Sequence, residues 1–305
     1  MNRNINVLFL LIGIFISHIS MAATLHTIIV GDTNADDIGK SVSVDVKRIE
    51  ELAKTVSNST RLKLNIQKIT GNRLNPRNVE NAVNSISSGS DDVVFFYWTG
   101  HGYNRGNSVL PTMYLGKPEN LNIGLSKIAK IIRGKKPRFS VVIGDTCNKP
   151  INGNRRDINL SIRGSENYKK LFLKYKGQVL AGGSKVGGYS YGNGRTGGVY
   201  TTAFLNSLTI ELAATGIPSW EKLMRTADKP IEVVPGIIQQ PMSSTRGVSY
   251  MGNLAVNVED CDNIRNRPDG TCGAPPELST GGQPNFGSSP SDGGGCTDDN
   301  NPDCW

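Results

Sequence analysis

The sequence predicts an α/β fold, a three-layer sandwich whose mainly parallel central sheet is covered by helices on both faces. Short β-branched or apolar runs alternate along the chain with longer amphipathic segments, which is typical of parallel sheets with crossover helices. One of these runs, Val93–Trp98, is continuously apolar, and Phe139–Ile143 is apolar except for Ser140, as is typical of strands buried on both faces. The 305 residues are enough for one large domain with a well-filled core.

The N-terminal segment is set apart from this fold. Arg3 precedes an apolar run, 7–16, and Ser20-Met21-Ala22 fits the small-x-small rule for signal peptidase. The run is shorter than the roughly 20 residues that span a bilayer, so we expect a cleaved signal peptide over 1–22 rather than a membrane anchor. Export would place the mature protein in the periplasm or outside the cell, in an oxidising compartment.

The body of the chain, 23–258, carries the expected strands and helices. Asn75-Pro76 is typical of a helix start, because a capping side chain precedes a proline in the first turn. Residues 148–170 are polar and basic and are expected to form a mobile loop. The expected elements are strands at 25–30, 61–69, 93–98, 139–143 and 179–181, and helices at 42–56, from 76 through Val79, Val83 and Ile86, at 125–132, 199–213 and 219–227.

The C-terminal tail, 259–305, differs from the body in composition. It is rich in Gly, Pro, Ser and Asp and is expected to be disordered or held by disulfides. It holds nine acidic residues against two arginines, so the body is more basic than the net charge of +8 of the whole chain. Without a basic helix or aromatic stripe, that charge indicates a solvated surface rather than nucleic-acid binding. Four cysteines, Cys261, Cys272, Cys296 and Cys304, lie in the tail.

These four cysteines predict two disulfides with three alternative pairings, of which pairing between sequence neighbours is favoured. A zinc site is the weaker alternative, because the tail has neither histidine nor Cys-x-x-Cys spacing. Cys147 is then the one cysteine of the body and a candidate free thiol.

His101 and Cys147 each follow an apolar strand and form the candidate catalytic pair. A thiol with a pKa near ~8.5 needs a neighbouring base to attack a carbonyl as thiolate. His26, at the start of the first strand, would lie at the edge opposite to the one where ligands bind, so His101 is the credible base. The structural alternatives are a buried small Cys147 and a His101 that satisfies a turn.

Two further residues, Gly102 and Asp145, complete the candidate site. The N–H groups of Gly102 and Cys147 are expected to hold the oxyanion of a tetrahedral intermediate. Asp145, two residues before the thiol, would point into the same region and could receive a basic substrate side chain; its structural alternative is a carboxylate that caps a loop.

The segments around these residues resemble caspase-like peptidases, and metacaspases more than animal caspases. Residues 91–102, DDVVFFYWTGHG, are similar to the family's acidic-apolar strand leading into Ser-Gly-His-Gly, with Thr99 in place of serine. Asp145-Thr146-Cys147 is similar to the metacaspase Asp-Cys-Cys. Residues 197–205, GGVYTTAFL, resemble the Gly-Gly-x-Phe-Thr segment, and Gln240-Pro241 resembles a Gln-x-Pro segment near the domain's end.

The resemblance covers about 24–258 and implies a caspase-like α/β/α sandwich that cleaves proteins or peptides with a Cys-His dyad. It makes Cys147 the nucleophile, His101 the general acid/base and Asp145 part of a pocket for Arg or Lys at P1, with Asp32 as a second pocket acid. It also implies a cleavable loop, here 148–177, and hence self-processing of a zymogen. The dyad itself requires no cofactor. Metacaspases often need calcium; Asp157 lies in a plausible loop, but no calcium-loop spacing is visible.

Two other functions stay open at this point. Asn148-Lys149-Pro150 replaces the metacaspase His-Ser-Gly, which favours a catalytically silent caspase-like binding module as the alternative. Ligation or deamidation would share the dyad and differ only in product. The sequence leaves the natural substrate, the trigger and the oligomeric state undetermined.

Overall fold

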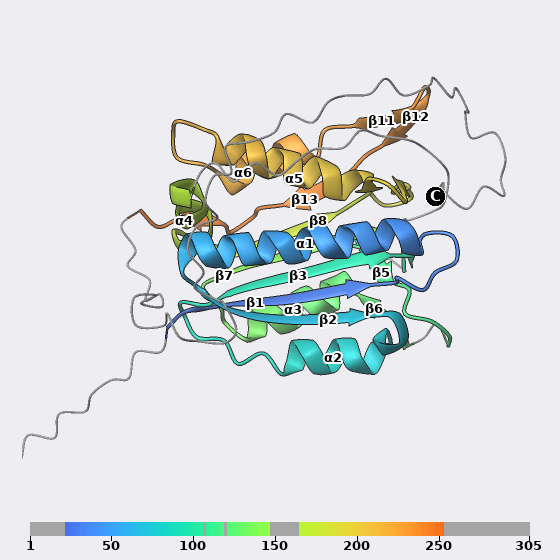
Figure 1. Ribbon diagram of the computed structural model, residues 1–305, viewed down its shortest axis with the longest axis horizontal. Coiled ribbons are helices and arrows are strands. Elements are labelled where there is room, and N and C mark those ends of the chain that lie inside the picture. Colours follow the sequence, from blue (N-terminus) through green and yellow to red (C-terminus); the bar gives the residue numbers. More distant parts are fainter. Residues whose placement is uncertain (1–21, 106–107, 119–120, 147–164, 253–305) are drawn as a thin grey trace, which may run out of the picture.

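The computed structural model describes residues 22–105, 108–118, 121–146 and 165–252 (Figure 1). Its helices and strands alternate along the chain, as the sequence predicts. The helices are α1 (Gly39–Thr60), α2 (Pro76–Asn84), α3 (Leu125–Gly134), α4 (Ser165–Leu173), α5 (Val199–Leu212) and α6 (Trp220–Ala227), with a short 3₁₀ turn at Gly71–Arg73. The strands are β1 (Thr24–Gly31), β2 (Lys63–Thr70), β3 (Val93–Gly100), β4 (Gly102–Tyr103), β5 (Thr112–Met113), β6 (Ile123–Gly124), β7 (Phe139–Thr146), β8 (Tyr175–Gly182), β9 (Gly192–Asn193), β10 (Gly197–Gly198), β11 (Ile231–Val234), β12 (Ile237–Gln239), β13 (Met242–Ser244) and β14 (Ser249–Tyr250).

The central sheet has the strand order β13-β8-β7-β3-β1-β2, with β14 also paired to β8. β2, β1, β3, β7 and β8 are mutually parallel, and β13 and β14 run antiparallel to β8. The mainly parallel sheet is therefore confirmed. All eight residues of β3 and all eight of β7 are buried, because these strands lie in the middle of the sheet with helices on both faces.

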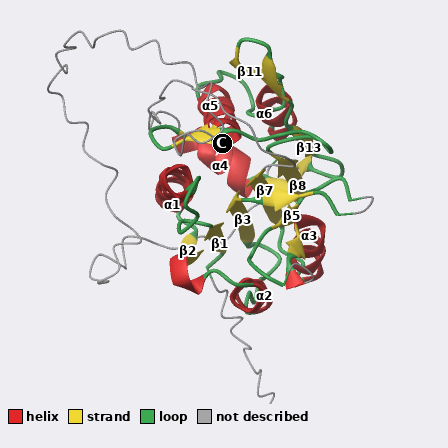
Figure 2. Ribbon diagram, turned by 90° about the vertical axis from the view of Figure 1, so that its right-hand side faces the viewer, coloured by secondary structure: helices red, strands yellow, loops and turns green. Residues whose placement is uncertain are grey.

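Helices cover both faces of the sheet (Figure 2), and each face has its own apolar core. Alternate residues of β3 supply the two cores: Phe95 and Tyr97 pack on the face covered by α1, α4, α5 and α6, and Phe96 and Trp98 on the face covered by α2 and α3. This alternation continues to the strand ends, so it also decides which face each site residue points toward.

Local chemistry fixes the ends of several helices. The Asn75 side chain accepts from the Asn78 N–H at 2.8 Å and Pro76 is the first helical residue of α2, as the sequence predicts. α2 ends at Asn84, so Ile86, expected on the same helix, lies beyond it as a buried loop residue. The Ser219 hydroxyl accepts from the Lys222 N–H and caps α6, which therefore begins at Trp220 rather than Ser219.

Two expectations about loops are wrong from residue 165 on. The expected polar loop 148–170 includes the first part of α4, Ser165–Leu173, whose Tyr168, Leu171 and Phe172 are buried in the core on the α1 face. The same helix and the start of β8 lie inside the candidate processing loop 148–177. The basic residues Lys169 and Lys170 lie among these apolar residues, so the sequence of α4 shows no clear helical period. Residues 147–164 lie outside the described residues, as do 1–21 and the tail from 253 on.

Short strands that the sequence did not predict surround the carboxyl edge of the sheet. β4, β5 and β6 form a small antiparallel sheet after β3, β9 pairs with β10, and β11 pairs with β12. Most are two or three residues long, too short for a recognisable alternation of apolar and polar residues.

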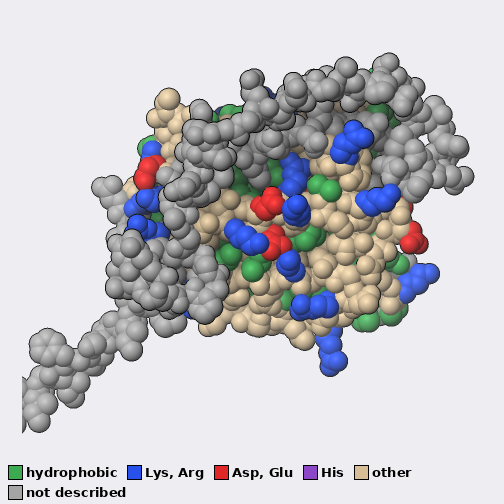
Figure 3. Space-filling model, viewed as in Figure 1, with side chains coloured by type: hydrophobic (Ala, Val, Ile, Leu, Met, Phe, Trp, Pro, Cys, Tyr) green, Lys and Arg blue, Asp and Glu red, His purple; other side chains and the backbone are tan. Residues whose placement is uncertain are grey.

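The distribution of charged side chains over the α1 face indicates whether this face could bind a nucleic acid. Figure 3 shows Lys and Arg side chains scattered over this face, with acidic side chains between them, rather than gathered in one stripe. Within the described ranges, none of the helices has the length and apolar character needed to cross a membrane.

Candidate active site

Three parallel strands end side by side at the edge where the candidate site lies. In the register of the sheet, Gly31 of β1 pairs with Thr99 of β3, and Thr99 pairs with Asp145 of β7. Gly100 pairs with Thr146, the last residue of β7. His101 follows β3 directly, whereas Cys147 follows Thr146 in the sequence and lies outside the described residues. Ligands of open α/β sheets bind at this carboxyl edge.

His101 is half-buried and has a carboxylate beside its ring. Its Nε2 lies 3.0 Å from Oδ1 of Asp37, which belongs to the turn between β1 and α1. Its carbonyl accepts a hydrogen bond from the Tyr114 N–H at 2.9 Å, which joins the end of β3 to the β4–β5 hairpin. Asp37 therefore holds the imidazole from the side of the turn before α1, and the hairpin holds the His101 backbone.

Gly102 lies against the end of β7. A Cβ at this position would collide with the Thr146 hydroxyl and lie 2.9 Å from Thr146 Cγ2, so the close approach of the two chains requires glycine. The bond from Tyr114 N–H to the His101 carbonyl makes Gly102 and Met113 a non-hydrogen-bonded pair of the antiparallel ladder. The Gly102 N–H is thus directed away from β5, as an oxyanion donor must be.

Asp145 is fully buried and points toward the α1 face of the sheet. Its Oδ1 accepts from the Ser190 hydroxyl at 2.5 Å, and its Oδ2 accepts from the N–H and the hydroxyl of Thr201 at 2.8 and 2.6 Å. Thr201 is in the first turn of α5, so Asp145 also lies near the positive end of that helix. These contacts join the end of β7 to α5 and to the loop after β8.

A second buried carboxylate, Asp45 of α1, lies beside Asp145. It accepts from the Gly198 N–H at 2.9 Å and from the Thr99 hydroxyl at 3.0 Å. The position of a Cβ on Gly198 would be 2.9 Å from both Asp45 Oδ2 and Asp145 Cγ, so Gly198 separates the two carboxylates. Arg48 donates to the Thr196 carbonyl at 2.8 Å and supplies a nearby positive charge.

The two carboxyls titrate as a pair. Burial, and then the neighbouring Asp145 charge, raise the pKa of Asp45 well above its ordinary value. Burial also raises the pKa of Asp145, although the hydrogen bonds from Ser190 and Thr201 favour its ionised form. Two like charges this close in a low dielectric oppose each other, so the state in which both are ionised is disfavoured.

A buried polar network extends from this pair into the loop after β8. Gln239 donates to the Gly183 carbonyl at 2.7 Å and to Ser190 Oγ at 3.0 Å, and it accepts from the Tyr191 N–H. On the other side, the Tyr97 hydroxyl lies 2.5 Å from Thr201 Oγ1. Segments that are far apart in the sequence are therefore held together around the end of β7.

Asp32 follows β1 at the same edge and is half-buried. Its N–H donates to the Thr99 carbonyl at 3.1 Å, and its own carbonyl accepts from Ala35. Burial raises the pKa of Asp32, while the charge of His101 lowers it and that of Asp37 raises it. Asp32, Asp37 and His101 therefore share one electrostatic environment.

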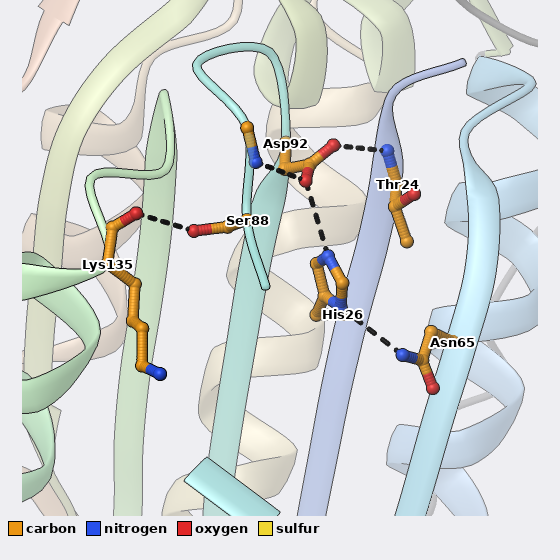
Figure 4. Close-up of polar contacts among 7 residues, drawn as sticks. Thr24, His26, Asn65, Ser88, Asp92 and Lys135 are labelled. Atoms are coloured by element: carbon orange, nitrogen blue, oxygen red, sulfur yellow. Dashed lines mark hydrogen bonds and ion pairs between the residues drawn. The ribbon is translucent and has the colours of Figure 1, made fainter. Parts of the chain in front are cut away.

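His26 lies at the opposite edge of the sheet, as expected, in a separate polar cluster (Figure 4). Its Nε2 is 3.3 Å from Asp92 Oδ2, and the Asn65 amide lies 3.3 Å from its Nδ1. Asp92 also accepts from the N–H groups of Thr24 and Gly89, both at 2.7 Å. This cluster ties the start of β1 to the loop before β3 and accounts for His26 structurally.

Sequence reasoning missed several residues of this edge. Asp37, Asp45, Ser190 and Gln239 carry no local motif, and only folding brings them to β3 and β7. The pair Asp36-Asp37, in the turn after the first strand, is the one signal that could have pointed to an acid beside His101. Across the described ranges, no group of three or more His, Cys, Asp or Glu side chains could hold a metal ion.

One comparison with known proteins identifies a family. The family model described as Caspase domain matches residues 28–245, which include β1, β3, β7 and α5. Among solved structures, the fold is similar to the crystal structure of protein GSU0716 from Geobacter sulfurreducens, with 15% identity, a TM-score of 0.46, and coverage of 72% of this chain and 92% of that chain. No curated protein matches this chain.

Proposed function

Because the chain belongs to the caspase-domain family of cysteine peptidases, we propose that it is an endopeptidase with Cys147 as nucleophile and His101 as general acid/base. The register at the ends of β3 and β7 is the observation that carries this proposal. Gly100 pairs with Thr146, so the next residue of each chain is His101 on one side and Cys147 on the other. Neighbouring strands lie about 4.8 Å apart, which is within reach of a thiol and an imidazole.

Side-chain alternation supports the same pairing. Thr99 and Asp145 point toward the α1 face, since Thr99 donates to Asp45 of α1 and Asp145 accepts from Thr201 of α5. Residues two positions further along extended chains point to the same face. His101 is two positions after Thr99, and its ring contacts Asp37 in the turn before α1; Cys147 is two positions after Asp145 in the sequence.

The proposed reaction is acyl transfer through a thioester. His101 takes the Cys147 proton, and the thiolate attacks the peptide carbonyl carbon. The tetrahedral oxyanion accepts hydrogen bonds from the N–H groups of Gly102 and Cys147. The C–N bond then breaks as the imidazolium gives its proton to the leaving amine. Water, deprotonated by His101, hydrolyses the thioester and restores the thiol.

We propose that this peptidase cuts after Arg or Lys, as the metacaspase resemblance implies. Asp32 is the more accessible of the two candidate pocket acids, and it lies in the same electrostatic environment as His101. Asp145 is fully buried, so it would act on a P1 cation through its charge, from behind the hydroxyl of Ser190. Asp32→Asn should then reduce cleavage after Arg and Lys more than Asp36→Asn, which changes an exposed acid of the following turn.

Self-processing is proposed for the part of the chain between β7 and α4. Four basic residues precede α4 and lie outside the described residues: Lys149, Arg155, Arg156 and Arg163. The basic residues from 165 to 177 belong to α4, to β8 or to the single residue between them. Peptidases cut extended chain, so cleavage is expected before residue 165. Incubation of a Cys147→Ala zymogen with native protein, followed by N-terminal sequencing, locates the cut.

Export and its consequences remain proposals of the same kind. We propose cleavage of a signal peptide after Ala22 or Ala23, release to the periplasm or the medium, and two disulfides among the four tail cysteines. Mass spectrometry of the secreted protein, with and without reduction, tests all three. The described residues offer no acidic cluster for calcium. Asp157 lies outside the described residues.

Hydrolysis of fluorogenic peptides with Arg, Lys or Asp at P1 tests the function itself. The native protein should cleave the Arg and Lys peptides, and Cys147→Ala and His101→Ala should not. A preference for Asp would contradict the basic pocket, and unchanged hydrolysis in both variants would contradict the dyad. No hydrolysis by the folded native protein would favour the silent binding module, and a ligated or deamidated product would identify another acyl transfer.

A further inference from the structure

Asp37 has a position relative to His101 that neither the motifs nor the proposed mechanism accounts for. Its Oδ1 lies 3.0 Å from His101 Nε2, which is hydrogen-bonding distance. The two residues are 64 positions apart in the sequence, with β2 and α2 between them along the chain. The contact therefore depends on the fold, and it joins the turn before α1 to the end of β3.

The turn that carries Asp37 is anchored at both ends. At its start, the Asp32 N–H donates to the Thr99 carbonyl of β3. At its end, Ile38 is fully buried against Val42, and the Gly39 N–H donates to the Ala35 carbonyl at 2.9 Å. A Cβ on Gly39 would lie 2.6 Å from the Thr33 carbonyl oxygen, so the turn is tightly folded on itself. The exposed Asp37 side chain thus projects from a fixed backbone.

The chemistry of this contact decides which ring nitrogen can act as the base. A carboxylate accepts hydrogen bonds and cannot donate them, so His101 Nε2 must carry the hydrogen. In the neutral imidazole the other nitrogen, Nδ1, then has the lone pair that can take a proton. When Nδ1 becomes protonated, the imidazolium keeps Nε2–H on Asp37, and a charge-assisted hydrogen bond stabilises it.

We propose that Asp37 is a positioning residue that fixes the tautomer and orientation of His101, so that Nδ1 is the nitrogen that takes a proton. This inference rests on the proposed peptidase function and adds a third member to its catalytic pair. Asp37 is half exposed to solvent, so its effect is expected to be smaller than that of a buried triad carboxylate.

Three variants test the role of Asp37. Asp37→Ala removes the acceptor, Asp37→Asn keeps an acceptor oxygen without charge, and Asp36→Ala changes the adjacent exposed acid as the matched control. Asp37→Ala should lower kcat about tenfold with KM nearly unchanged, Asp37→Asn should lower kcat less, and Asp36→Ala should leave both unchanged. Thermal unfolding of all three should match the native protein, because an exposed pair contributes little to stability.

A spectroscopic readout makes the test independent of finding a good substrate. His26 and His101 are the two histidines after residue 22, so ¹⁵N spectra of histidine-labelled protein resolve each ring. His101 should be the Nε2–H tautomer in native protein and Asp37→Asn, and a mixture of tautomers in Asp37→Ala, with His26 unchanged. Unchanged tautomer and kcat in Asp37→Ala would overturn the inference. If instead His101→Ala and Cys147→Ala kept full activity, the proposed function would fail, whatever the tautomer.

Discussion

Gly198→Ala should damage the fold through one steric contact at the buried acid pair. Gly198 is the N-cap of α5 with φ −67°, a conformation that alanine adopts without strain. The added Cβ, however, would collide with Asp145 Oδ2 and lie 2.9 Å from Asp45 Oδ2. Neither carboxylate can move cheaply, because Asp145 is held by Ser190 and Thr201 and Asp45 by Thr99.

The magnitude follows from the cost of overpacking a rigid core. Such substitutions cost about 1–3 kcal/mol, and a contact with two hydrogen-bonded carboxylates belongs at the upper end, about 3 kcal/mol. For a domain of this size that corresponds to a fall in Tm of roughly 6–12 °C. Peptidase activity should fall as well, since Asp145 lies two residues before Cys147.

Thermal unfolding followed by circular dichroism measures this effect, with Gly134→Ala as the matched control. A Cβ on Gly134 meets nothing within 4 Å, and the residue ends α3. The control should be as stable as the native protein or about 0.5–1 kcal/mol more stable, because alanine has less freedom in the unfolded chain. A Gly198→Ala protein that unfolds within 1 °C of native would refute the close packing of the acid pair.

Two predictions concern pH. Burial, and then the charge of Asp145, raise the pKa of Asp45 in the folded state, so the free energy of unfolding falls as pH rises above the ordinary carboxyl pKa. In urea titrations, the free energy of unfolding of Asp45→Asn should therefore fall less between pH 5 and 8 than that of the native protein. Equal falls in the two proteins would contradict the coupling. For Asp92 burial alone would raise the pKa, but hydrogen bonds from His26 and from backbone N–H groups outweigh it and hold the pKa below its ordinary value. The contribution of Asp92 to stability is therefore present at neutral pH and lost in acid. The free energy of unfolding of Asp92→Asn should be roughly 1 kcal/mol lower than native at pH 7 and should fall less steeply than native below about pH 4. A fall in acid as steep as that of the native protein would contradict this prediction.

Most of the fold could be predicted because its strands and helices are long enough to show their period. β3 contains the continuous apolar run Val93–Trp98, β7 contains the apolar run Val141–Ile143, and α2 begins at a recognisable Asn-Pro cap. Helix α4 was missed because Lys169, Lys170 and Glu166 lie among its buried apolar residues, and a short helix gives few repeats. The two- and three-residue strands around the site depend on tertiary pairing and leave no periodic signal.

The site was predictable only where chemistry-bearing residues follow strands. His101, Asp145 and Asp32 lie at the carboxyl edge because parallel strands end together there. Their surroundings were not predictable, because the residues that contact Asp145 are distant in the sequence. Ser190 lies 45 positions after it and Thr201 lies 56 positions after it. Asp37 lies in the turn before α1 and Asp45 lies on α1. Which face of α1 turns toward the sheet is decided by packing and carries no local motif in the sequence.

Covalent capture of Cys147 tests the central claim most directly. The native protein is incubated with a peptidyl electrophile that carries Arg at P1, and the adduct is located by peptide mass spectrometry. We predict one adduct, on Cys147, formed at least tenfold more slowly in His101→Ala and not at all in Cys147→Ala. An adduct rate on Cys147 that is unchanged in His101→Ala, or no adduct on Cys147 in the folded native protein, would contradict the account.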